Sequence, residues 1–131
     1  GVLGFEALSR GADEAWFIEN DPKLVKSLEK QSRILDANAR IIKADALKTI
    51  STAPSKLFDI VFVDPPYMMD LSEVLFQLSS WVSSDNLVYV ERQAKPRIQL
   101  IEQLAKSHPS AIVRKQAMAG QVVYGLLTLK K

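Results

Sequence analysis

The chain has 131 residues, 47% of them hydrophobic and 24% charged, which is the composition of an ordinary globular domain. It contains no cysteine and one histidine, which excludes disulfides, a thiolate nucleophile and a Cys/His zinc site. The apolar stretches are too short to span a bilayer, and the first residues lack the layout of a signal peptide. We therefore expect a soluble, cytoplasmic protein with no membrane partner. The single histidine, His108, stands between Ser107 and Pro109 in a segment typical of a surface loop.

The formal net charge of +2 is unevenly distributed along the chain. Residues 1–93 carry 10 Lys or Arg against 14 Asp or Glu, whereas residues 94–131 carry seven against one. This asymmetry indicates either a polyanion bound near the C-terminal third or a solvated basic surface. The sequence favours neither explanation over the other.

Apolar runs alternate with segments of helical period, which is typical of a mostly parallel sheet covered by helices. We expect helices over residues 3–10, 22–35, 71–82 and 98–104, and strands over residues 15–19, 41–45, 58–64 and 87–91. Gly11 is suited to end the first helix, Asp21 to cap the second and Asp70 to cap the third. The strand over 58–64 is apolar at consecutive positions, so both of its faces should be buried. Residues 111–115 and 122–129 are too close for a crossover helix and should form an antiparallel hairpin around Gly120.

Four of these predicted strands end in an acid, and the acids are Glu19, Asp45, Asp64 and Glu91. In an open α/β sheet ligands bind beyond the carboxyl ends of the strands, so the four acids should converge on one cleft. Glu19 follows a glycine-containing helix and is placed to accept hydrogen bonds from the two hydroxyls of a nucleoside ribose. The structural alternative is that such acids cap helices, which explains Glu19 and Asp64 poorly because both precede the capping positions.

The most specific signal is the sequence Asp64-Pro65-Pro66-Tyr67. Neither proline has a backbone N–H, so this rigid turn presents only acceptors beside the carboxylate. A carboxylate and a carbonyl that accept the two hydrogens of an exocyclic amine can aim the nitrogen lone pair at an electrophile. Tyr67 offers an aromatic face on which an extruded base can stack. A proline-rich turn followed by a core tyrosine is the alternative.

Six segments together resemble a known family, and they are GVLGFEALSRGA, FIEND, KADAL, FDIVFVDPPY, VYVE and RKQAMAGQVVYGLL. They resemble the class I S-adenosylmethionine-dependent methyltransferases that modify the N2 amine of a guanine in small-subunit ribosomal RNA, the RsmD-like group. This resemblance covers nearly the whole chain. It implies a three-layer, Rossmann-like α/β fold, mostly parallel, with a C-terminal antiparallel hairpin.

The resemblance also implies roles for individual residues. It assigns S-adenosylmethionine to Gly1, Gly4, Glu19, Asp45 and Ala46, and the target guanine to Asp64, Pro65, Pro66 and Tyr67. The glycines would line the methionine end of the cofactor, Glu19 would hold the ribose hydroxyls, and Asp45, with Ala46 beside it, would face the adenine amine. Methyl transfer would then be a direct displacement without a metal. The implied partner is small-subunit ribosomal RNA or the assembling small subunit, bound by a monomer.

One departure from the family's pattern concerns the first strand. The family begins with a central strand that runs into an acidic residue and a fuller glycine turn, and this sequence starts after both. Without that strand, a long edge in the core would remain unpaired. We therefore expect residues 1–131 to be one methyltransferase domain in the form of a fragment.

Three other functions share part of this pattern. An adenine-N6 DNA or RNA methyltransferase would use the same acid-Pro-Pro-Tyr turn, and a non-catalytic RNA-binding remnant would fit the missing strand. A nicotinamide-dependent dehydrogenase would share the ribose-binding acid but has no use for the turn at Asp64.

In the basic C-terminal third, Lys95, Arg97, Arg114 and Lys115 could flank the substrate entrance.

Overall fold

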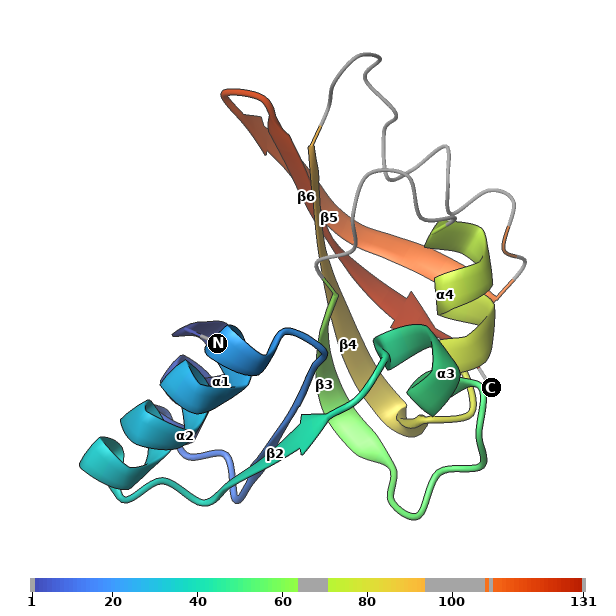
Figure 1. The fold of residues 1–131 in the computed structure, drawn as a ribbon. Coiled ribbons are helices and arrows are strands. Elements are labelled where there is room, and N and C mark those ends of the chain that lie inside the picture. Colours follow the sequence, from blue (N-terminus) through green and yellow to red (C-terminus); the bar gives the residue numbers. More distant parts are fainter. Residues whose placement is uncertain (1, 64–70, 94–107, 109, 131) are drawn as a thin grey trace. The chain divides into compact units, whose positions relative to one another are not determined.

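The structure is a computed structural model that describes residues 2–63, 71–93, 108 and 110–130 (Figure 1). The chain divides into two compact units, the N-terminal unit Gly1–Thr52 and the C-terminal unit Ala53–Lys131. Each unit is described by itself. No helix among the described residues is long and apolar enough to cross a membrane.

The N-terminal unit is built around two parallel strands. Its elements in chain order are α1 (Val2–Ser9), β1 (Ala15–Glu19), α2 (Pro22–Leu35), β2 (Ala39–Lys43) and α3 (Ala46–Ile50). β1 and β2 run in register from Ala15 opposite Ala39 to Glu19 opposite Lys43. Two parallel strands need a crossover connection, which α2 supplies, so this unit is the predicted βαβ arrangement.

The signals at the start of α2 act as the sequence predicts. The side chain of Asp21 accepts a hydrogen bond from the backbone N–H of Lys23 at 2.9 Å, and Pro22 takes the first helical position. Asp36 ends the helix in a left-handed conformation with a φ of 48°.

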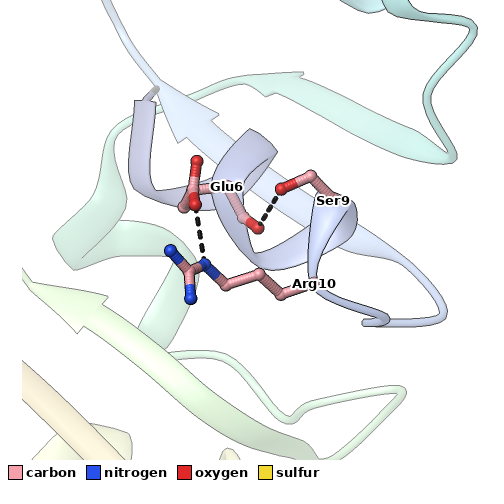
Figure 2. A network of polar contacts seen from close by, with 3 residues as sticks. All are labelled: Glu6, Ser9 and Arg10. Carbon is pink, nitrogen blue, oxygen red and sulfur yellow. Dashed lines mark hydrogen bonds and ion pairs between the residues drawn. The ribbon is translucent and has the colours of Figure 1, made fainter.

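One side of α1 packs on β1 and the other side is exposed. The buried ring of Phe5 lies 4.7 Å from the ring of Phe17, measured between centroids. On the exposed side, the Ser9 hydroxyl donates to the Glu6 carbonyl and Arg10 Nε donates to Glu6 Oε1, each at 2.7 Å (Figure 2). This ion pair is solvated and contributes little to stability.

The C-terminal unit contains a four-stranded mixed sheet and one described helix. Its elements are β3 (Phe58–Val63), α4 (Leu71–Leu78), β4 (Val82–Gln93), β5 (Ala111–Ala119) and β6 (Val122–Leu129). The strand order is β3-β4-β6-β5, with β3 and β4 parallel and the other pairs antiparallel. The predicted hairpin is therefore confirmed, and Gly120 in its turn has a positive φ of 59°.

The core of this unit lies between α4 and one face of the sheet (Figure 1). Its fully buried or nearly fully buried apolar side chains come from alternate strand positions and from one side of the helix, and they are Leu71, Val74, Leu75, Leu78, Val88, Val90, Val123, Leu127 and Leu129. Asn86 is the buried amide at the end of this core. Its Nδ2 donates to the carbonyls of Ser83 and Leu129, and its Oδ1 accepts from the Leu129 N–H. Asn86 thereby joins β4 to the end of β6.

The opposite face of the same sheet carries a row of aromatic rings. Phe62 meets Tyr89 at 6.1 Å and Tyr89 meets Tyr124 at 6.5 Å between centroids. Ile60 is 50% exposed and Phe62 is 41% exposed. The prediction that both faces of the strand over 58–64 are buried is therefore wrong. An apolar run shows that the side chains are hydrophobic, but it does not show whether another element covers each face of the strand.

Three further predictions are corrected by the structure. The helix expected over 71–82 ends at Leu78, because a turn follows in which the Trp81 N–H donates to the Leu78 carbonyl at 2.8 Å, and Val82 already begins β4. The strand expected over 87–91 is part of this longer β4, so Glu91 is not at a strand end. His108 is 6% exposed and is therefore not a surface residue, since the loop-like sequence around it does not determine burial.

Some predictions lie outside the described residues or concern strand pairing. The helix expected over 98–104 and the capping residue Asp70 are outside the described residues. Among the described strands, β1 pairs with β2 alone and β3 pairs with β4 alone.

Candidate functional site

The carboxyl ends of β1 and β2 bring two of the predicted acids to one edge. Glu19 is the last residue of β1 and stands opposite Lys43, the last residue of β2. The N–H of Ala44 donates to the Glu19 carbonyl at 3.1 Å, which extends the pairing by one step. The strand expected over 41–45 ends at Lys43, so Asp45 is not a strand end; it follows Ala44 and begins the turn into α3. Both acids therefore lie at the edge where an open α/β sheet binds its ligands.

The side chain of Glu19 is held in place by its own backbone. Its Oε1 accepts hydrogen bonds from the N–H groups of Asn20 and Asp21, both at 3.1 Å. These two donors fix the orientation of the carboxylate and stabilise its charge. No described residue donates to Oε2, so this oxygen can accept hydrogen bonds from a ligand.

Asp45 combines a structural role with a free acceptor. Its Oδ1 accepts from the Lys48 N–H at 3.1 Å, and its carbonyl accepts from the Thr49 hydroxyl at 2.9 Å. Asp45 is therefore the N-cap of α3, with Ala46 exposed at the first helical position. The cap uses one carboxylate oxygen, and the other remains free to accept from an amine.

Gly4 has a packing role that the sequence did not reveal. A Cβ built on Gly4 would overlap the ring of Phe17. The glycine is needed here because α1 approaches β1 too closely for a side chain. Spacing along the sequence could not show this contact, because the helix and the strand meet only in the folded unit.

The remaining predicted site residues either lie outside the described residues or lie within strands of the C-terminal unit. Gly1, Lys95, Arg97 and the four residues 64–67 lie outside the described residues, although β3 ends at Val63, directly before Asp64. Glu91 lies within β4 opposite Tyr124. Of the four acids expected to converge, the described structure brings together Glu19 and Asp45. Within the same described residues, no group of three His, Cys, Asp or Glu side chains forms a possible metal site.

Comparison with known sequences gives a family match and related proteins. The model of the family described as conserved hypothetical protein 95 matches residues 1–126. The ribosomal RNA small subunit methyltransferase D of Escherichia coli strain K12 is 33% identical over 130 residues, which are 96% of this chain and 62% of that protein. The protein of the same name from Buchnera aphidicola is 32% identical over 102 residues, 75% of this chain and 53% of the relative. The chain thus spans less than two thirds of the length of these curated relatives.

Comparison with solved structures gives similar backbones. An Escherichia coli protein described as a methyltransferase has a TM-score of 0.81 and 32% identity, over 98% of this chain and 69% of that one. A Haemophilus influenzae protein described as a methylase also has a TM-score of 0.81, with 28% identity over 100% of this chain and 81% of that one. The arrangement of helices and strands is therefore shared with both.

Proposed function

The chain belongs to the family described as conserved hypothetical protein 95, and we propose that it forms the S-adenosylmethionine-dependent domain of an enzyme that methylates a guanine N2 amine in small-subunit ribosomal RNA. Its architecture is the Rossmann-like fold of class I methyltransferases. The observation that carries the proposal is the match of residues 1–126 to the family, together with the 33% identity to ribosomal RNA small subunit methyltransferase D of Escherichia coli.

The described site fits the adenosine part of S-adenosylmethionine. Glu19 Oε2 is an acceptor suited to ribose hydroxyls, because the backbone already fixes the carboxylate through Oε1. The free oxygen of Asp45 is an acceptor suited to the adenine amine at the same sheet edge. The bound cofactor supplies an electrophilic methyl group, and the residues of this chain bind and orient it.

The substrate side of the proposal rests on the sequence after β3. Asp64 and the Pro65 carbonyl would accept the two hydrogens of the guanine N2 amine and direct its lone pair. Tyr67 would stack on the extruded base, and the rigid Pro66 would keep the turn in one conformation. The proposed partner is ribosomal RNA or the assembling small subunit, bound in the cytoplasm by a monomer.

The decisive experiment incubates the protein with labelled S-adenosylmethionine and immature small ribosomal subunits, followed by nucleoside analysis. The Asp64→Ala variant serves as the comparison, with cofactor binding measured in parallel by calorimetry. We expect label in N2-methylguanosine from the unmodified protein and loss of at least about 100-fold in rate for Asp64→Ala, with cofactor affinity retained.

Other outcomes would contradict the proposal in distinguishable ways. Label in N6-methyladenosine would identify an adenine methyltransferase. RNA binding without any transfer would indicate a non-catalytic RNA-binding protein. Loss of cofactor binding in Asp64→Ala would show that Asp64 supports the cofactor site instead of the amine.

A further inference from the structure

A β-bulge in β5 places two cations on one face of the C-terminal sheet. Val113 stands opposite Leu127, but Lys115 stands opposite Leu126, so Arg114 is an extra residue in the strand. Residues opposite each other in an antiparallel pair point to the same face, and Leu126 belongs to the face turned away from the buried Leu127. Lys115 therefore lies on the face opposite α4, together with Arg114. In a strand without a bulge, successive side chains point to opposite faces, and the two cations would lie on different faces.

The side chain of Arg114 is anchored on this same face. Its Nε donates to the Thr128 hydroxyl at 3.1 Å, and Thr128 stands opposite Ile112 beside the bulge. The Thr128 hydroxyl in turn donates to the Asn86 carbonyl at 3.2 Å. This chain of hydrogen bonds fixes the guanidinium through one nitrogen and leaves its two terminal nitrogens available to a ligand.

The charges of this pair are not neutralised within the described residues. Both side chains are exposed, and no described carboxylate forms an ion pair with either of them. Two neighbouring cations repel each other, and an anionic ligand relieves this repulsion. A fixed guanidinium has the geometry to bind two phosphate oxygens at once.

We propose that Arg114 and Lys115, brought together by the bulge in β5, bind phosphate groups of the RNA backbone on the sheet face opposite α4. The identity of the polyanion as RNA rests on the proposed function. Thr128 is a positioning residue in this arrangement, because it holds Arg114 and does not itself need to touch the RNA. The bulge thus gives the basic C-terminal third a defined binding surface.

The test measures binding of a small-subunit ribosomal RNA fragment over a series of KCl concentrations. We expect Arg114→Ala/Lys115→Ala to weaken binding about tenfold or more near 0.1 M salt and to lower the log–log salt slope by about one unit per residue. The control Lys26→Ala/Lys30→Ala removes two exposed charges from α2 and should leave both quantities unchanged. Circular dichroism checks that all variants are folded.

Two further variants separate charge from positioning. Thr128→Val keeps both cations but removes the anchor of Arg114, so affinity should fall severalfold while the salt slope stays the same. Arg114→Lys keeps the charge without the forked donors and should likewise keep the slope but lose affinity.

The outcomes separate this inference from the proposed function. A double variant with the same salt slope and affinity as the control would overturn the phosphate-binding pair, even if the protein methylates ribosomal RNA. If the double variant lost binding to anionic phosphatidylserine vesicles while its RNA binding stayed unchanged, the proposed RNA contact would also be overturned. The pair would then belong to a membrane-binding surface. RNA binding with the expected slope change but without methyl transfer would support the pair and refute the proposed function.

Discussion

Gly4 of α1 faces the ring of Phe17 in β1 without room for a methyl group between them. The ring cannot easily move away, because it already packs against the buried Phe5 at 4.7 Å. Two effects therefore compete when Gly4 is replaced by alanine. Helix propensity favours alanine by about 1 kcal/mol, whereas overpacking costs about 1–3 kcal/mol.

We expect the overpacking to win, so Gly4→Ala should lower the free energy of unfolding by about 1–2 kcal/mol. Urea denaturation followed by circular dichroism measures this change. Ser9→Ala, at an exposed position of the same helix, is the control and should change stability by less than about 0.5 kcal/mol. If the Gly4→Ala protein were more stable than the unmodified one, the Phe17 ring would have to move and make room for the added methyl group.

Glu19→Ala should weaken the binding of S-adenosylmethionine about tenfold or more, because the ribose hydroxyls lose their acceptor. Glu19→Gln keeps one oxygen for the N–H groups of Asn20 and Asp21 and should lose less affinity. Isothermal titration calorimetry measures both, with Glu29→Ala on the exposed side of α2 as the control. Equal affinity in Glu19→Ala and the control would remove Glu19 from the cofactor site.

Asn86→Leu should lower the free energy of unfolding by about 3 kcal/mol, because the N–H and carbonyl of Leu129 lose their partners in a buried position. Chemical denaturation measures the effect. Asn38→Ala, which removes an exposed hydrogen bond to the Asp13 carbonyl, should cost less than about 1 kcal/mol. If the two variants lost equal stability, Asn86 would not be a structural link.

His108→Leu should raise the free energy of unfolding by about 1 kcal/mol. Both ring nitrogens of His108 are buried without a hydrogen-bond partner among the described residues, so an apolar side chain removes a desolvation cost. His108→Gln, which keeps polar atoms at the site, should not show this gain. A loss of stability in His108→Leu, measured by thermal unfolding, would mean that the imidazole has a role in the fold.

Local signals in the sequence were sufficient wherever neighbouring residues determine the structure. Asp21 and Pro22 define the start of α2, and the short connection at Gly120 defines a hairpin. The acid at the end of β1 was also predictable, because strand length and the capping position after it are both visible in the sequence.

The features that could not be predicted depend on contacts between distant segments. The overlap of Gly4 with Phe17 and the burial of His108 arise only when elements pack together. The bulge that turns Lys115 toward the side of Arg114 changes strand alternation by one residue, and no glycine or proline marks it. The exposed Phe62 shows the same limit, because a strand sequence does not say which of its faces another element covers.

The strand order of the C-terminal unit has a consequence for folding during synthesis. β6 follows β5 in the chain but lies between β4 and β5 in the sheet. Among the described strands β5 pairs with β6 alone, so it has no partner until β6 has been made, and the edge of β4 stays open until residues 122–127 have left the ribosome. A stall in translation before β6 would leave a nascent chain with an unpaired strand edge, and such an edge can pair with another chain and lead to aggregation.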